Sequence, residues 1–209
     1  MQWFESPLGS YLLEHEYRYF DKVVANIFGY NAIQIGLPQF CFLRLNRMPL
    51  QFSVGLEKTQ PALIAAADFL PIQSNSIDLA IMPHTLEFSN NPHQILREVY
   101  RVLIPEGHIV ISGFNPLSLW GISRYLKANR AEYPWNGNFI ALLRLKDWLK
   151  LLDFETMGGQ LCCYAPPFEQ EKWRKRLSFM EAAGDRWWPI GGGVYFLHAI
   201  KHMHGMRVI

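Results

Sequence analysis

Alternating apolar and polar blocks over residues 66–114 predict the best-defined part of this chain. A near-continuous apolar run over 77–82 is typical of a strand that is covered on both faces. Asn91-Pro92 then provides a helix N-cap and a first-turn proline, followed by an apolar stripe at helical spacing. Pro105-Glu106-Gly107 predicts the turn that ends this helix, and the apolar run over 109–113 predicts the next strand. Strand, helix and strand in this order indicate a mostly parallel α/β sheet.

The same periodicity predicts elements along the rest of the chain. A helix is expected from Ser10 to about Gly29, with an apolar stripe that includes Leu13, Tyr17 and Phe20. It packs on the sheet or forms a lid over a ligand site, and the pattern leaves both open. The other predicted elements are strands over 31–36, 51–55, 63–67, 154–164 and 194–200, and helices over 116–126, 145–152 and 168–183.

Length and composition favour one well-buried domain. The chain has 209 residues, half of them apolar and 14% aromatic, which excludes a disordered chain. We therefore expect a single domain over 1–209, in three parts: a helical cap over 1–29, a first half over 30–114 and a second half over 115–209.

Charge and cysteine content narrow the function classes. A formal net charge of +2 is too small to indicate a nucleic-acid partner. Cys41, Cys162 and Cys163 form no CxxC pair or zinc spacing, so we expect a reducing, cytoplasmic location and no metal. No apolar run reaches membrane-spanning length, so no membrane insertion is expected.

Polar residues at predicted strand ends are the candidate functional groups. Asp68 follows an apolar segment, and a carboxylate there needs a partner. A turn cap and a ligand contact explain it equally well. Gly36 ends the first predicted strand, where nucleotide-binding folds turn tightly, but the GxGxxG pattern of dinucleotide-dependent oxidoreductases is absent. His84 follows the strand over 77–82 and can titrate near neutral pH.

Four segments together resemble a known family. They are Asp68-Phe-Leu-Pro-Ile, Ser76-Ile-Asp-Leu-Ala-Ile-Met-Pro-His-Thr-Leu-Glu, Asn91-Pro-His-Gln-Ile-Leu-Arg-Glu-Val-Tyr-Arg-Val-Leu-Ile-Pro-Glu-Gly and Ile109-Val-Ile-Ser-Gly-Phe-Asn-Pro. These resemble class I S-adenosylmethionine-dependent methyltransferases of the type 11 group, and within it a small bacterial subfamily of uncharacterised members. The resemblance implies a three-layer Rossmann-like fold, with a mostly parallel seven-stranded sheet and a reversed C-terminal β-hairpin.

The resemblance also implies roles for individual residues. The region over 30–114 would bind S-adenosylmethionine, and 115–209 would supply helices on the substrate side and the final strands. Asp68 would accept a hydrogen bond from the adenine amino group, with Phe69 against the ring. Gly36, with Leu37 after it, would lie under the methionine and ribose, and Glu57 is the nearest match to the ribose-binding acid. The residues expected to face the sulfonium and the nucleophile are Met82, Pro83 and His84.

The chemical roles of His84 and Asn115 have structural alternatives. His84 is the candidate general base, although a histidine at this place also packs and forms hydrogen bonds. Asn115 would orient substrate, although a helix-cap role accounts for it as well. His198, His202 and His204 alternate along the C-terminal strand, but without a carboxylate they do not make a convincing metal site.

Two function classes follow from these residues. The first is an S-adenosylmethionine-dependent methyltransferase for a small-molecule acceptor, acting as a monomer or homodimer without nucleic acid. The second is a catalytically degenerate binding or regulatory module, because the first motif, Gln34-Ile-Gly36-Leu-Pro, lacks the acid and the additional glycines of the family.

Overall fold

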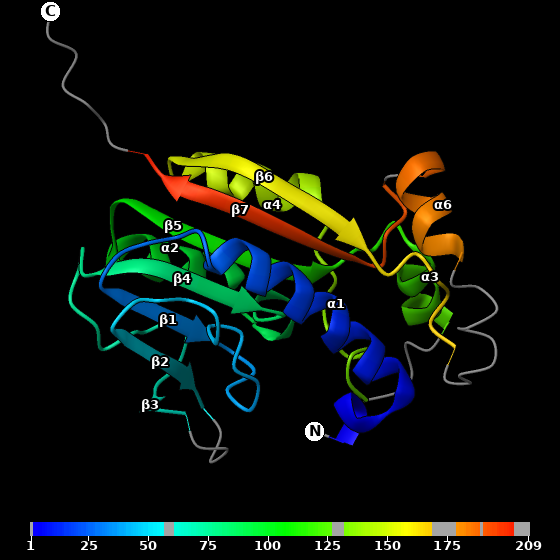
Figure 1. Ribbon diagram of the computed structural model, residues 1–209, viewed down its shortest axis with the longest axis horizontal. Helices are drawn as coiled ribbons and strands as arrows, with labels where there is room; N and C mark the ends of the chain where they lie inside the picture. The colour runs from blue at the N-terminus through cyan, green and yellow to red at the C-terminus, as the bar shows by residue number, and fades with distance from the viewer. Residues whose placement is uncertain (1, 57–60, 127–131, 169–178, 189, 203–209) are drawn as a thin grey trace, which may run out of the picture.

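A twisted seven-stranded sheet forms the centre of the computed structural model, which describes residues 2–56, 61–126, 132–168, 179–188 and 190–202 (Figure 1). The strand order is β3-β2-β1-β4-β5-β7-β6. All neighbouring strands from β3 to β5 are parallel, and β7 is antiparallel to both β5 and β6. This confirms the predicted sheet with a reversed C-terminal hairpin.

The elements alternate along the chain as the pattern predicted, with shifts at their ends. The strands are β1 (Asn31–Ile35), β2 (Leu50–Gly55), β3 (Leu63–Ile64), β4 (Ile77–Pro83), β5 (Leu103–Phe114), β6 (Phe154–Cys162) and β7 (Val194–Lys201). The α-helices are α1 (Pro7–Val24), α2 (Pro92–Val102), α3 (Leu119–Leu126), α4 (Leu142–Leu151) and α6 (Phe179–Trp187). Short 3₁₀ helices lie over Gln2–Glu5 and Leu86–Phe88.

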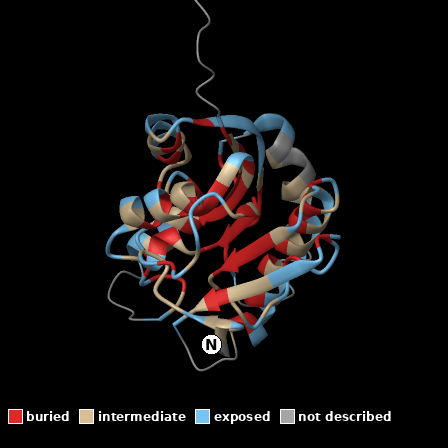
Figure 2. Ribbon diagram, turned by 90° about the vertical axis from the view of Figure 1, so that its left-hand side faces the viewer, coloured by how far each residue is buried: buried red, intermediate tan, exposed pale blue. Residues whose placement is uncertain are grey.

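Side chains that alternate along the strands build one apolar core on each face of the sheet. In β4, Leu79 and Ile81 face the core under α1, whereas Ala80 and Met82 face the core under α2 and α4. Figure 1 shows α1 crossing one face, with α2 and α4 on the other, and Figure 2 shows the buried residues concentrated on the strands. The predicted three-layer α/β architecture is therefore confirmed.

Helix α1 begins earlier than predicted, and its buried stripe differs in part from the predicted one. The side chain of Ser6 accepts a hydrogen bond from the Gly9 N–H, and Pro7 occupies the first turn, so this cap starts the helix before Ser10. The buried positions are those at about four-residue spacing, namely Leu8, Leu12, Glu16, Tyr19, Phe20 and Val24. Leu13 and Tyr17 are only half-buried and pack against the edge of this core, whereas Glu16 lies on the buried side of the helix.

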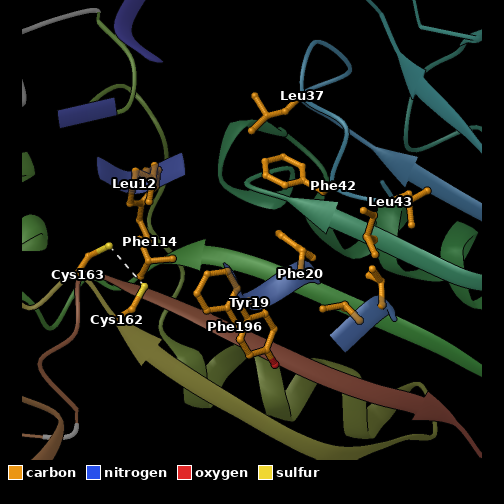
Figure 3. Packing of buried hydrophobic residues seen from close by; sticks show 14 of the residues in the cluster. Leu12, Tyr19, Phe20, Leu37, Phe42, Leu43, Phe114, Cys162, Cys163 and Phe196 are labelled. Atoms are coloured by element: carbon orange, nitrogen blue, oxygen red, sulfur yellow. Dashed lines mark hydrogen bonds between the residues drawn. The ribbon is translucent and has the colours of Figure 1, made fainter. Parts of the chain in front are cut away.

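Rings from α1 fill the core on that face of the sheet. Tyr19 stacks on Phe196 of β7 with ring centroids 4.1 Å apart, and Phe20 packs against Phe42 (Figure 3). Phe42 belongs to residues 36–49, which connect two parallel strands by turns without an α-helix. The buried side chains of this loop therefore cover sheet surface that a crossover helix would otherwise cover.

The start of β5 differs from the prediction. The turn expected at Pro105-Glu106-Gly107 lies inside the strand, as an irregularity in its pairing with β4. Glu106 has a φ of 62°, and the pairing advances from Ile77–Leu103 to Leu79–His108. The extra residues on β5 bulge out of the ladder, so the strand continues through a segment whose proline and glycine resemble a turn.

A buried lysine at the end of β7 forms hydrogen bonds with the chain beside this bulge. Lys201, the last residue of β7, donates hydrogen bonds to Asn75 Oδ1 (2.9 Å), Tyr100 O (2.9 Å) and Leu103 O (2.7 Å). Its ammonium group also lies 4.4 Å from the centroid of the Tyr100 ring. Burial lowers the pKa of Lys201.

In two other predicted helices, the described part starts later than predicted. The helix expected from Pro116 starts at Leu119, because Asn115 Oδ1 accepts from the Leu117 N–H and the chain turns first. The helix expected over 168–183 is described only from Phe179 onward, as α6, because residues 169–178 lie outside the described residues. Within the described part of the chain, no helix has the length and apolar character needed to cross a bilayer.

Candidate functional site

A cavity of about 560 Å³ opens at the carboxyl ends of the central parallel strands. Its lining residues come from the segments that follow β1, β2, β3 and β4, and from Tyr133. The strand order reverses between β1 and β4, since the chain runs outward from β1 to β3 and then returns to β4. Open α/β sheets bind ligands at this switch point, and the volume suits a small organic ligand.

Gly36 shapes the floor of the cavity through its missing side chain. Its φ is +90°, and an added Cβ would lie 2.6 Å from Thr85 Oγ1. That hydroxyl donates a 2.6 Å hydrogen bond to the Ile35 carbonyl, so the loops after β1 and β4 meet at this point. Only glycine allows both the backbone angle and this close approach.

The first part of the loop after β1 is held by a buried amide side chain. Gln34 Nε2 lies within hydrogen-bond distance of the carbonyls of Gly36 (3.2 Å), Leu37 (3.0 Å) and Phe40 (2.7 Å). Its Oε1 accepts from the Phe42 N–H at 3.0 Å. A glutamate in this position could not donate to the three carbonyls, so glutamine is the residue that this loop requires.

A buried polar cluster lies at the inner end of the site, and we call Glu16, His84 and Glu87 the buried triad. His84 Nδ1 lies 3.1 Å from Glu87 Oε1, and His84 Nε2 lies 3.1 Å from Glu16 Oε1 at an angle outside a good hydrogen bond. Ser112 Oγ donates to Glu16 Oε1 at 2.7 Å, and the Phe114 N–H donates to Glu87 Oε1 at 2.7 Å. The triad therefore joins α1, the end of β4 and the end of β5.

The two carboxylates determine the protonation state of His84. Burial alone lowers the pKa of the imidazole, but the charge of Glu16, followed by the hydrogen bond and the charge of Glu87, outweighs it and raises the pKa to about 9. Phe114 stacks on the imidazole with ring centroids 4.0 Å apart, and no surface of the His84 side chain is exposed. His84 is thus an imidazolium at neutral pH, which favours a positioning role over proton abstraction.

Two oxygen atoms near the triad have no hydrogen-bond partner among the described residues. They are Glu16 Oε2 and the hydroxyl of Tyr133, both inaccessible to solvent. The Tyr133 ring lines the cavity and stacks on Phe88 with centroids 4.7 Å apart. Burial, followed by the charges of Glu16 and Glu87, raises the pKa of Tyr133, so its hydroxyl stays neutral. Buried polar atoms of this kind are costly unless a ligand or water completes them.

The structure brings some of the predicted cofactor residues together and separates others. Gly36, Leu37, Asp68 and His84 line the cavity. Phe69 is 80% exposed and Met82 is buried in the core under α2, and neither is part of the lining. Pro83 is buried at the end of β4 with its carbonyl turned toward Thr85, and Glu57 lies outside the described residues.

Asn115 holds a distant loop rather than lining the cavity. Its Nδ2 donates to the carbonyls of Ile190 (2.8 Å) and Gly192 (2.9 Å), so the side chain fixes the glycine-rich segment before β7. The predicted substrate contact of Asn115 stays a prediction.

The predicted C-terminal histidine group is also divided in the structure. His198 Nε2 lies 2.9 Å from His108 Nδ1 of the neighbouring strand, whereas His202 lies 3.9 Å from Glu155. His204 lies outside the described residues.

Sequence reasoning missed Glu16 and Tyr133, the two residues with unpartnered oxygens. Glu16 was readable in principle, because Leu12, Glu16 and Phe20 share one helical stripe. Tyr133 had no comparable signal, since it belongs to a loop that reaches the site only in three dimensions.

Comparison with known proteins agrees with this geometry. The family profile described as "Methyltransferase domain" matches residues 47–111. The uncharacterised protein YafS of Escherichia coli K12 is 30% identical over 174 residues, which is 83% of this chain and 70% of YafS. The chain belongs to the same family as YafS, and its residues 47–111 match the methyltransferase domain of the type 11 group.

Solved structures with low sequence identity share the fold. An S-adenosylmethionine-dependent methyltransferase of Thermotoga maritima, titled a possible histamine N-methyltransferase, superposes with a TM-score of 0.71 at 18% identity, covering 96% of this chain and 93% of its own. A putative methyltransferase of Haloferax volcanii, solved with the activator Trm112, gives a TM-score of 0.68 at 12% identity, covering 91% and 90%. At such identities, the similarity establishes the fold alone.

Proposed function

We propose that this protein transfers the methyl group of S-adenosylmethionine to a small-molecule acceptor. The observation that carries this proposal is the cavity at the switch point between β1 and β4, with Gly36 and Asp68 in its wall. The missing Cβ of Gly36 lets Thr85 bring the loop after β4 against the loop after β1, and this close contact forms the wall against which the methionine and ribose portion would bind.

The lining residues offer both a polar group and an apolar surface for the adenine of the cofactor. Asp68 is half-buried, and no described residue forms a hydrogen bond with its carboxylate, so it is free to accept the adenine amino group. Leu56, Ala67 and Ile95 supply apolar surface beside it for the adenine ring. Bound in this way, the cofactor supplies an electrophilic methyl group on a sulfonium ion.

The residues of the chain would orient the reactants rather than abstract a proton through His84. In-line transfer depends mainly on holding two groups in near-attack geometry and excluding water. The buried triad fixes the end of β4 against α1, and the Tyr133 ring lines the cavity, so its buried hydroxyl would form a hydrogen bond with the acceptor once ligand binding exposes it. The rings of Phe88 and Tyr133 favour an acceptor with an aromatic or apolar body and one polar group.

Calorimetric titration with S-adenosylmethionine tests the cofactor site. The Asp68→Ala variant should bind S-adenosylmethionine at least about tenfold more weakly than the wild type, equal to about 1.4 kcal/mol. Asp147→Ala, which removes an exposed carboxylate on α4, should bind like the wild type. Equal affinity in the two variants would contradict the adenine assignment, and absence of binding by folded wild-type protein would contradict the proposed function.

A binding module without turnover is the second candidate function. It is favoured by the loop after β1, where Leu37 has a φ of 44° and Gln34 stands in the position of the family's acid. Such a module would bind S-adenosylmethionine but would not form S-adenosylhomocysteine with any acceptor fraction that is active with a related methyltransferase. Product formation that is lost in Asp68→Ala would identify the enzyme instead.

A further inference from the structure

A second group of chemically reactive side chains lies away from the cavity. His15 of α1 and the adjacent Cys162 and Cys163 at the end of β6 each offer one ligand atom, and these atoms all lie within 4.8 Å of one another. The two sulfur atoms are 3.4 Å apart, and Figure 3 shows them turned toward each other. His15 is half-buried, and both cysteines are buried.

The backbone at Cys163 makes this arrangement possible. Adjacent residues of a strand point to opposite faces, so neighbouring cysteines do not normally meet. Here β6 ends at Cys162, and Cys163 has a φ of 59°, which turns its side chain to the same side. A tetrahedral ion with bonds of about 2.3 Å to two thiolates holds the sulfurs about 3.8 Å apart, so a small widening would admit it.

A cavity gives access to this group of side chains, and a carboxylate lies in its wall. A cavity of about 300 Å³ is lined by His15, Cys162 and Glu181, among others. Glu181 of α6 is held by the Tyr11 hydroxyl and by the Ala165 N–H, which both donate to its Oε1. Its carboxylate therefore lies at the same cavity in a fixed position, where a water molecule that it holds can complete a four-coordinate ion.

We propose that His15, Cys162 and Cys163 bind a thiophilic divalent metal ion of the zinc type. Two thiolates and an imidazole are the ligands that zinc prefers in proteins, and binding would release the two thiol protons to solvent. The ligands come from α1 and β6, and Glu181 comes from α6, so the bound ion would fasten the N-terminal helix to the end of the reversed hairpin. Sequence spacing did not reveal this site, because His15 is distant in the chain and adjacent cysteines match no zinc motif.

Titration of the reduced, metal-free protein with Co²⁺ tests the site directly. Cobalt in a site with two thiolates gives a thiolate-to-metal charge-transfer band and the visible bands of tetrahedral geometry. We expect one Co²⁺ per chain, displaced by Zn²⁺, and a rise in the melting temperature on Zn²⁺ binding. These readouts do not depend on S-adenosylmethionine, so failure of the metal site and failure of the proposed function are distinguishable.

Three variants separate the site from incidental binding. Cys162→Ser and His15→Gln should lose the charge-transfer band or its tetrahedral visible bands while keeping the wild-type circular dichroism. Cys41→Ser, which removes the exposed cysteine, should keep the full signal. The proposal is overturned if the folded, fully reduced wild type shows no charge-transfer band, or if the band survives in Cys162→Ser and disappears in Cys41→Ser.

Discussion

The charges of Lys201 and of the buried triad lie buried at opposite ends of the sheet. The two groups differ in how many of their polar atoms have a hydrogen-bond partner. Lys201 is surrounded by three oxygen acceptors within 3 Å, at the end where β5 begins. The triad lies at the carboxyl end of β4, where Glu16 Oε2 and the nearby Tyr133 hydroxyl have no described partner. The first group is complete within the chain, and the second is not.

This difference separates a structural role from a functional one. A buried polar group whose hydrogen bonds are all made within the protein stabilises the fold and leaves nothing for a ligand. Unpartnered polar atoms beside a cavity cost stability, and a ligand can recover that cost. Substitutions at Lys201 should therefore change stability alone, whereas substitutions beside the triad should change ligand chemistry.

The largest expected effect on stability is that of Lys201→Met. The variant keeps an apolar side chain of similar length but leaves three carbonyl-type oxygens without their donor. We expect the free energy of unfolding to fall by about 3 kcal/mol, measured by urea denaturation. Lys150→Met, at an exposed position on α4, is the matched control and should change it by less than about 0.5 kcal/mol. A stable Lys201→Met protein, or one with altered S-adenosylmethionine affinity, would break the contrast.

The next largest effect is a dependence of the free energy of unfolding on pH, caused by the titration of His84. Its pKa is raised to about 9 in the folded protein, above the ordinary value of 6.5. The stabilisation is therefore fully present below about pH 6.5 and is lost as the pH rises through 9. Between pH 7 and pH 9, the free energy of unfolding should fall by about 2 kcal/mol from this group.

The Glu16→Gln variant isolates this contribution from other titrating groups. Without the charge of Glu16, the pKa of His84 falls and the stability should decline less steeply between pH 7 and pH 9. Parallel stability profiles for the variant and the wild type would show that the imidazolium is not held by Glu16.

A smaller effect is expected for Gly36→Ala. The new methyl group would meet Thr85 Oγ1, and the backbone would keep a φ of +90° that alanine disfavours. We expect a loss of at least about 1 kcal/mol in the free energy of unfolding and weaker binding of S-adenosylmethionine. Gly158→Ala is the control, because a Cβ there meets no atom within 4 Å. Similar behaviour of the two variants would remove Gly36 from the cofactor site.

The smallest effect on stability is expected for Tyr133→Phe. This variant tests most directly whether the groups beside the triad serve ligand binding and not the fold. Because the hydroxyl has no described partner, its removal should change the free energy of unfolding by less than about 0.5 kcal/mol. The same change should slow methyl transfer at least about tenfold once an acceptor is known, since a hydrogen bond to the acceptor is lost. A destabilised variant with normal transfer would assign the hydroxyl to the fold.

The sequence predicted the apolar strands well but did not reveal which charged residues are buried. Apolar runs predicted β4 and the middle of β5, because strands buried on both faces carry few polar residues. Asp68 was found because it ends such a run. Glu16 and Lys201 were not, since a charged residue on a helix or strand reads as exposed until its distant partners are known.

Gln34 concentrates several contacts of the loop after β1 in one side chain. In a glycine-rich loop the conformation is spread over several backbone positions, so no one of them determines it alone. Here one amide bonds to three carbonyls and one N–H group. Loss of the amide would remove all of these contacts at once and leave the loop with its backbone turns and the hydrogen bonds of Asn46. A substitution of Gln34 should therefore disturb the loop more than a substitution of an exposed residue in the same loop.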